Sequence, residues 1–261
     1  MRLDAASATW PEADGARRRR APAVLPFGAL EQHGPHLPLS TDTIMAGWLA
    51  GRVADAVDGW LLPAIPLGDT AANDGFPGTL SLSFDTVRAI ATDVGRNLRR
   101  SGFSCLIVVN GDWGNQAALR LAARDLAAGG AWPVLLIDYP GLSEVAAQVC
   151  LTPPAGPNFY HADEVETSVV LALSPELVHM ERAVAGYPEM PATLGATPAD
   201  LARLSPSGVF GDPRPAGADK GRTILEMLAQ RAISLASSFL AEVAASGTAT
   251  QCPDPEPPPP R

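Results

Sequence analysis

Short apolar runs alternate along this chain with longer segments whose apolar residues recur every three or four positions. The short runs are typical of buried strands. The periodic segments predict amphipathic helices, each of which packs one apolar face on a core. The predicted strands cover 23–27, 60–66, 103–109 and 132–138.

Helical periodicity follows each of the first three runs, and after the fourth run the chain contains helical segments and no further predicted strand. A strand followed by a helix, repeated along the chain, predicts an α/β fold in which a mostly parallel sheet is flanked by helices. With 261 residues, the chain can form one large domain and has little left for a second. The apolar residues recur at helical spacing from Ile44 to Val57, Val87 to Leu98, Leu119 to Leu126, Val169 to Leu173, and Ile224 to Val243.

Polar loops follow two of the predicted strands, where a parallel sheet brings its carboxyl ends to one edge. The first loop contains Glu31 and His33 and leads to Asp42 at the start of a helix. Two carboxylates and an imidazole suit a hard or borderline divalent metal. Spacing alone leaves alternatives open, since His33 or His36 could hydrogen-bond within the proline-bracketed loop and Asp42 could simply cap the helix.

Charge and composition exclude several classes of protein. The net charge of −9 argues against a nucleic-acid partner. No apolar run approaches the roughly 20 residues that span a bilayer, and no apolar segment follows the arginines at 17–20, so neither a membrane span nor a secretory signal is expected. Three widely spaced cysteines fit a reducing cytoplasm better than a disulfide framework.

The two ends of the chain differ in composition from its centre. Residues 1–21 are polar and rich in Ala and Arg, which predicts a partly ordered N-terminal lead-in. Residues 247–261 are rich in proline and show no packing pattern, which predicts a disordered tail. The packed domain is therefore expected over residues 22–246.

Four motifs stand in order along the chain. They are Glu-Gln-His-Gly-Pro-His-Leu-Pro-Leu at 31–39 with Thr-Asp at 41–42, Phe-Pro-Gly-Thr at 76–79, Asn-Gly-Asp-Trp-Gly-Asn at 110–115, and His-Ala-Asp-Glu-Val-Glu-Thr-Ser at 161–168. Together they resemble the motifs of the creatininase (creatinine amidohydrolase) family, over roughly residues 22–245. The resemblance implies a creatininase-like α/β hydrolase domain, built as a three-layer sandwich.

The resemblance also implies a two-metal centre. Glu31, His33 and Asp42 are the implied ligands, with Asp42 bridging the ions. Glu166 would complete the site and take part in catalysis, and His161 would be catalytic or would orient the substrate. The implied cofactor is a divalent metal, one or two ions of Zn, Mn or Fe.

Several positions depart from the family pattern. Asp112 stands where the family has a metal-binding histidine, and because carboxylates also bind hard divalent ions we expect it as a ligand that favours Mn or Fe. Asn73 replaces a frequent histidine, and Gly114 replaces a glutamate ligand of creatininase, which weakens the case for creatinine as substrate. Trp113, Asn115 and Asn73 are expected to contact the substrate, although Trp113 could instead be a buried residue beside a tight turn.

These features predict an enzyme. We expect metal-activated water to attack a linear or cyclic C–N amide bond, other than a peptide bond, in a small molecule of a biosynthetic or catabolic pathway. The resemblance further implies a homo-oligomer, often a hexamer in the family, with no nucleic-acid or membrane partner. Two alternatives remain: a non-hydrolytic reaction at an altered metal site, and a non-catalytic binding or scaffold subunit.

Overall fold

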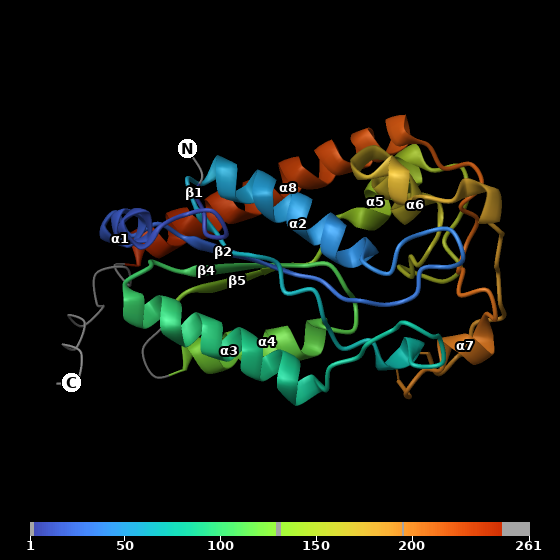
Figure 1. The fold of residues 1–261 in the computed structure, drawn as a ribbon, viewed down its shortest axis with the longest axis horizontal. Helices are drawn as coiled ribbons and strands as arrows, with labels where there is room; N and C mark the ends of the chain where they lie inside the picture. The colour runs from blue at the N-terminus through green and yellow to red at the C-terminus, as the bar shows by residue number, and fades with distance from the viewer. Residues whose placement is uncertain (1–2, 129–131, 195, 247–261) are drawn as a thin grey trace.

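A parallel sheet lies between two layers of helices in the computed structural model, which describes residues 3–128, 132–194 and 196–246 (Figure 1). The tail expected at 247–261 lies outside these residues. Every strand pairing is parallel, which confirms the predicted single-domain α/β fold with a parallel sheet flanked by helices. In spatial order the strands are β1 (Leu3–Asp4), β3 (Trp60–Leu61), β2 (Ala23–Phe27), β4 (Leu106–Asn110) and β5 (Val134–Ile137).

The helices cover both faces of the sheet, with α2 and α8 on one side and α3 and α4 on the other (Figure 1). The α-helices are α1 (Trp10–Arg18), α2 (Thr41–Ala56), α3 (Phe84–Ser101), α4 (Gln116–Ala127), α5 (Leu142–Val149), α6 (Glu164–Leu173), α7 (Leu201–Leu204) and α8 (Ala218–Ala245). Single 3-10 turns form η1 (Ala71–Asn73), η2 (Pro175–Leu177) and η3 (Met180–Arg182).

The central strands β2 and β4 are buried along their whole length. Their side chains alternate between the two faces, so Leu25 and Val108 pack on the α3 and α4 side, whereas Val24 and Ile107 pack on the α2 and α8 side. A strand that is buried on both faces must be apolar throughout, which explains the continuous apolar runs in the sequence. Because β2 and β4 pair in parallel to their ends, the loops that follow them start side by side.

The strand predicted over 60–66 is shorter in the structure. β3 ends after two residues, and Ile65 then forms a single bridge with Phe27. Pro63 and Pro66 have no backbone N–H, so a regular ladder of hydrogen bonds cannot continue through them.

Residues 3–21 contain two elements that the sequence prediction left out. β1 pairs with β3 at the edge of the sheet, and α1 buries Ala16 completely. The backbone N–H of Thr9 donates to the Glu12 carboxylate at the start of α1 (2.7 Å). This Thr-x-x-Glu pattern is a helix-start signal that the sequence carried. The domain start at residue 22 stays a prediction.

The long helix α8 is the one described helix that is apolar and long enough to cross a membrane by composition. In the structure it packs against α2, α5 and α6. Its inward residues are buried at helical spacing, which identifies it as a core helix: Ile224, Leu225, Leu228, Ala229, Ala232 and Ala236.

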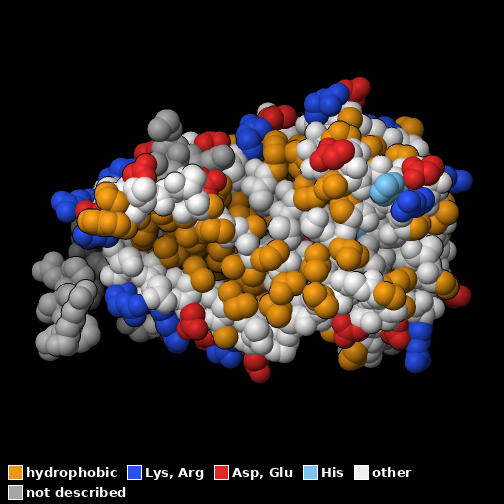
Figure 2. Space-filling view, in the orientation of Figure 1, with side chains coloured by type: hydrophobic (Ala, Val, Ile, Leu, Met, Phe, Trp, Pro, Cys, Tyr) orange, Lys and Arg blue, Asp and Glu red, His pale blue; other side chains and the backbone are white. Residues whose placement is uncertain are grey.

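Some apolar side chains reach the surface. Figure 2 shows hydrophobic side chains gathered in a band between the two helical layers on one face of the molecule. Elsewhere on the described surface, Trp10, Leu80, Trp113 and Leu151 are large apolar residues that are more than half exposed.

Candidate metal centre

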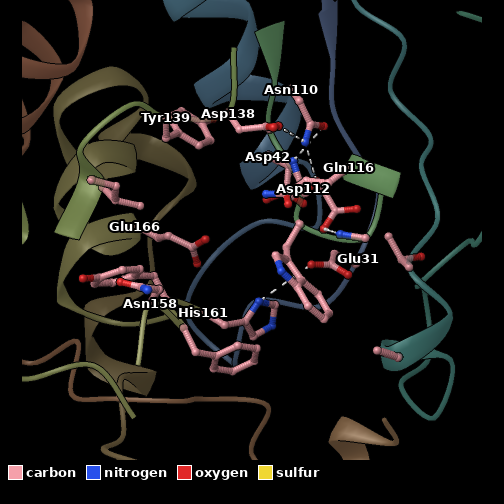
Figure 3. A pocket seen from close by; sticks show the side chains of 18 of the residues that line it. Glu31, Asp42, Asn110, Asp112, Gln116, Asp138, Tyr139, Asn158, His161 and Glu166 are labelled. Atoms are coloured by element: carbon pink, nitrogen blue, oxygen red, sulfur yellow. Dashed lines mark hydrogen bonds and ion pairs between the residues drawn. The ribbon is translucent and has the colours of Figure 1, made fainter. Parts of the chain in front are cut away.

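Three segments bring acidic and histidine side chains to the carboxyl-end edge of the sheet (Figure 3). The loop between β2 and α2 carries Glu31 and His33, and the loop after β4 carries Asp112. The first turns of α2 and α6 carry Asp42 and Glu166, where the partial positive charge of a helix N-terminus favours a carboxylate. The structure thus gathers all five expected ligands, and their role as ligands stays a prediction.

His33 lies in the middle of this cluster. Its Nε2 is 3.2 Å from Asp42 Oδ1, 3.6 Å from Glu166 Oε2 and 3.9 Å from Glu31 Oε1. Three trios have ligand atoms within 4.8 Å of one another, and the third of them is Glu31 with His33 and His161. The two trios that contain Asp42 are His33 with Asp42 and Glu166, and Glu31 with Asp42 and Asp112. Asp42 belongs to both trios, which is the arrangement expected of a carboxylate that bridges two adjacent cations.

Hydrogen bonding leaves the ligand atoms of the cluster available. His33 Nδ1 donates to the Glu31 backbone carbonyl (3.1 Å), so Nε2 is the nitrogen that faces the carboxylates and would offer its lone pair to a bound metal. In the described part of the chain, His33 Nε2, Asp42 Oδ2 and Asp112 Oδ2 are buried and have no hydrogen-bond partner. A buried polar atom without a hydrogen-bond partner lowers the stability of the folded protein. Divalent cations held by the two trios that share Asp42 would satisfy these atoms, so the residues present fit a metal.

Burial and mutual repulsion perturb the ionisable side chains. Burial, followed by the Asp42 carboxylate, raises the pKa of Asp112 to about 8, and burial also raises the pKa of Glu166 to about 8. Burial together with Asp112 and Asp42 raises the pKa of Glu31 well above its usual range. Burial alone would lower the pKa of His33, but Asp42 and Glu166 more than reverse this effect. Without cations the cluster therefore retains extra protons, which metal binding would displace.

The backbone of its own loop holds Asp112. The Gly114 N–H donates to Asp112 Oδ1 (3.1 Å), which leaves Oδ2 for the cluster. A Cβ at Gly114 would meet the Asp69 carbonyl oxygen at 1.9 Å, so this backbone has no room for a side chain there. The loop backbone therefore requires glycine at position 114 and cannot carry a glutamate there. Asp112 is the one acidic side chain that the loop presents.

Asn115 does not have the substrate-contacting position that we expected. It is fully buried and is not among the described residues that line the cavity. Its Oδ1 accepts the Asp69 N–H (2.8 Å), and its Nδ2 donates to the Gly28 carbonyl (3.0 Å). Asn115 therefore joins two loops at the edge of the sheet, which corrects the expectation.

A cavity of about 830 Å³ opens at the cluster. The four acidic residues of the two trios line it, and so do Asn73, His161 and Trp113. Trp113 is 58% exposed, so it stands at the rim rather than in the core. Among the described residues, no lysine or arginine lines the cavity. Further acidic residues do: Asp69, Asp138 and Glu144.

Two of the expected residues contact the cluster from one side. Asn73 Nδ2 donates to Glu31 Oε2 (2.7 Å), and His161 Nδ1 lies 3.7 Å from Glu31 Oε1. The rings of His161 and His33 lie with their centroids 4.5 Å apart. Burial, followed by the neighbouring His33, lowers the pKa of His161 well below its usual range, which favours a neutral ring.

Two polar residues at this site were missed by sequence analysis. Gln32 Nε2 lies between Asn73 Oδ1 (2.8 Å) and His161 Nε2 (2.7 Å). Tyr139 lines the cavity, and its buried hydroxyl has no hydrogen-bond partner among the described residues. Tyr139 comes two residues after β5, at the same edge of the sheet as the ligand loops, and that position was the available signal. Gln32 carried no comparable signal.

Comparisons with known proteins agree with this architecture. A family model described as Creatininase: Creatinine amidohydrolase matches residues 6–236. The mycofactocin precursor peptide peptidase of Mycobacterium ulcerans (strain Agy99) is 34% identical over 241 residues, which is 87% of this chain and 84% of that protein.

Two solved structures are also similar. A mutant creatininase of Zn-Zn type has a TM-score of 0.80, and a structure described as creatininase Mn has a TM-score of 0.79. Each is 28% identical to this chain, and each alignment covers 93% of this chain and 99% of the other.

Proposed function

This chain belongs to the creatininase family, and from that premise we propose that it is a metal-dependent amidohydrolase. Its substrate would be a small molecule with a linear or cyclic C–N amide bond, and water would be the nucleophile. One observation carries the proposal. Four carboxylates line one cavity and gather around His33 Nε2, and several of the buried ligand atoms have no hydrogen-bond partner among the described residues.

The cluster would hold one or two divalent ions. His33, Asp42 and Glu166 would bind one ion, and Glu31, Asp42 and Asp112 the other. A divalent ion lowers the pKa of a bound water and polarises a carbonyl oxygen, which is the chemistry that amide hydrolysis requires. Four carboxylates and one imidazole form a hard ligand set, which supports Mn or Fe somewhat over Zn. The similarity to creatininase structures described with zinc and with manganese supports those two metals.

The chain's own side chains would position the substrate. Asn73 donates to Glu31 and so fixes the direction of that carboxylate. His161, beside the cluster and within the cavity lining, would orient the amide. Trp113 at the rim would cover the bound substrate with its indole ring and reduce its exposure to water.

The charge of the cavity supports a neutral or cationic substrate. Two divalent ions would balance the four carboxylates of the cluster, and Asp69, Asp138 and Glu144 would then leave the lining acidic. Since none of the described lining residues is a lysine or arginine, an anionic group on the substrate would have no cationic side chain to bind.

The proposal also covers the oligomeric state and the cellular location of the enzyme. The family resemblance supports a homo-oligomer, with a hexamer as the specific expectation. Light scattering during size-exclusion chromatography tests this, and a monomer at micromolar concentration would contradict it. A cytoplasmic location is supported by the sparse, widely spaced cysteines.

The first experiment is elemental analysis of protein purified without added metal or chelator. We expect one or two equivalents of divalent metal in the wild type and less in Asp112→Ala. Asp69→Asn is the matched control, because Asp69 lines the same cavity but belongs to neither trio, and it should keep the wild-type content. A wild-type protein that contains no metal and also takes up no Mn, Zn or Fe would contradict the proposal and favour a non-catalytic subunit.

The second experiment measures hydrolysis of an amide panel by the metal-loaded protein. Small linear and cyclic amides belong in the panel, and so do short peptides, because one relative is named a peptide peptidase. We expect turnover of small amides, loss of that turnover in Asp42→Asn, and one oxygen atom from labelled water in the product. Product that contains no solvent oxygen would instead support a non-hydrolytic reaction.

A further inference from the structure

The side chain of Gln32 is held in one orientation by backbone groups. Its Oε1 accepts the Gly34 N–H (2.8 Å), and its Nε2 lies 3.2 Å from the Gly208 carbonyl oxygen. A backbone N–H can only donate and a backbone carbonyl can only accept, so these contacts decide which end of the amide is oxygen and which is nitrogen. Gln32 is 5% exposed, so water does not compete for these positions.

Two glycines shape the space that Gln32 fills. A Cβ at Gly208 would lie 1.8 Å from Gln32 Oε1, and Gly208 has a φ of +73°, which disfavours other residues. Gly34 also has a positive φ, +66°, and its N–H donates to the same oxygen. The backbone of two separate segments is therefore built around this one side chain.

The Gln32 amide nitrogen then decides which nitrogen of His161 carries hydrogen. Gln32 Nε2 is 2.8 Å from Asn73 Oδ1, and Asn73 is oriented in turn because its Nδ2 donates to the Glu31 carboxylate. The same Gln32 Nε2 is 2.7 Å from His161 Nε2. The two amide hydrogens of Gln32 serve the two shorter contacts, and the Gly208 carbonyl is the longer, shared one. Two N–H donors cannot face each other at 2.7 Å, so His161 Nε2 must be the acceptor.

We infer that Gln32 is a positioning residue that holds His161 as its Nδ1–H tautomer. His161 Nδ1, which then carries the hydrogen, lies at the edge of the cluster, 3.7 Å from Glu31 Oε1. His161 can therefore donate a hydrogen bond to a substrate oxygen, but its Nδ1 is not a free lone pair for metal, although it lies within ligand distance of Glu31 and His33. The use of this N–H on an amide rests on the proposed function, whereas the tautomer does not.

His33 shows the opposite arrangement a short distance away. There Nδ1 donates to a backbone carbonyl, so Nε2 is the nitrogen that would offer a lone pair to a metal in the cluster. Two rings with centroids 4.5 Å apart thus present different groups to the same site, a lone pair from His33 and an N–H from His161. The neighbours of each ring, Gln32 for one and the Glu31 carbonyl for the other, separate a metal-binding histidine from a hydrogen-bonding one.

The test is the ¹⁵N NMR signature of the imidazole rings in protein with ¹⁵N-labelled histidine, recorded metal-free and zinc-loaded. The chain has four histidines, so His161→Gln assigns the relevant signals by their loss. We expect His161 Nε2 to resonate as an unprotonated, hydrogen-bonded nitrogen and Nδ1 as a protonated one. A protonated Nε2 with an unprotonated Nδ1 in the wild type would overturn the inference without any further variant.

Two substitutions test the role of Gln32 itself. Gln32→Glu places an acceptor opposite His161 Nε2 and should move the proton to that nitrogen, whereas Gln32→Met removes the donor and should leave a mixture of tautomers. His36, whose Nε2 contacts Thr167 Oγ1 (2.8 Å), should keep its signals in both variants and reports that the fold is intact. Unchanged His161 signals in both folded variants would contradict the assignment to Gln32.

An activity measurement links the tautomer to the proposed hydrolysis. Gln32→Met should lower kcat for an amide substrate by about 10- to 100-fold, which is typical of a residue that orients a catalytic group, while the metal content stays at the wild-type level. If the NMR assignment holds but no amide is hydrolysed, the proposed function fails and the tautomer inference stands. If hydrolysis occurs but the NMR assignment is reversed, only the inference about Gln32 fails.

Discussion

Removing metal from this protein should make its stability fall as the pH rises. A chelator would leave the carboxylates of the cluster buried together without cations. The folded protein raises the pKa of Glu166 to about 8, mainly through burial, against an ordinary value of 4.5. It also raises the pKa of Asp112 to about 8 and that of His33 above its ordinary value. Between about pH 5 and pH 8, the folded state therefore binds more protons than the unfolded state.

The sign and the size follow from linkage. Because a proton is bound more tightly in the folded state, the free energy of unfolding decreases as pH rises through this interval. For Glu166 the folded and unfolded pKa values differ by roughly 3.5, which corresponds to about 5 kcal/mol. Asp112 and His33 act in the same direction but interact with the same charges, so their contributions do not simply add. A loss of about 5 kcal/mol is comparable to the whole stability of many domains.

Urea unfolding at pH 5, 6.5 and 8, with chelator and with saturating Mn²⁺, would measure this effect. We expect the chelated protein to lose stability from pH 5 to 8 and the Mn²⁺-loaded protein to resist that loss. Glu166→Gln should flatten the slope of the chelated protein, whereas Glu144→Gln, at the exposed rim, should leave it unchanged. A chelated wild type whose stability is constant or rises over this interval would refute the reasoning.

Three further predictions concern the cluster and the loops around it. Asp42→Asn should lower the metal content measured by elemental analysis more than Asp112→Ala does, because Asp42 belongs to both trios; equal losses would contradict the bridging arrangement. Asn115→Ala leaves two buried backbone groups without partners, so urea unfolding should show a loss of about 2–4 kcal/mol, and a loss below 1 kcal/mol would contradict its structural role. Gly114→Ala must displace the Asp69 carbonyl, so metal content should fall while circular dichroism retains the helical signal, and normal metal content would show that the loop can adapt.

The sequence predicted the central strands of the fold well, because the residues that a buried strand requires are visible within the strand itself. β2 and β4 are buried on both faces, so their apolar runs are continuous and easy to recognise. The first strand, β1, was missed for the opposite reason. β1 has only two residues, and its pairing depends on β3, which lies more than fifty positions away in the sequence.

The sequence predicted which residues converge at the site, but not the direction and hydrogen-bond partners of each side chain. The motif residues Glu31, His33 and Asp42 do converge, as the common edge of a parallel sheet requires. Whether a polar residue in such a loop faces the cavity or the neighbouring loop depends on the path of the backbone, which is why Asn115 was assigned wrongly. Gln32 was missed because its partners Asn73 and His161 are distant in sequence, so nothing local marks it as a hydrogen-bonding junction.

The position of α8 has a consequence for how the protein is made. α8 packs on α2 and α6, the helices whose first turns carry Asp42 and Glu166. It is also the last described element of the chain, so it leaves the ribosome after every segment of the cluster has been synthesised. Until then the inner faces of α2 and α6 lack their cover, and the nascent chain exposes apolar surface that chaperones recognise. A ribosome that stalls before residue 218 would therefore release a chain that contains every ligand but cannot assemble the site.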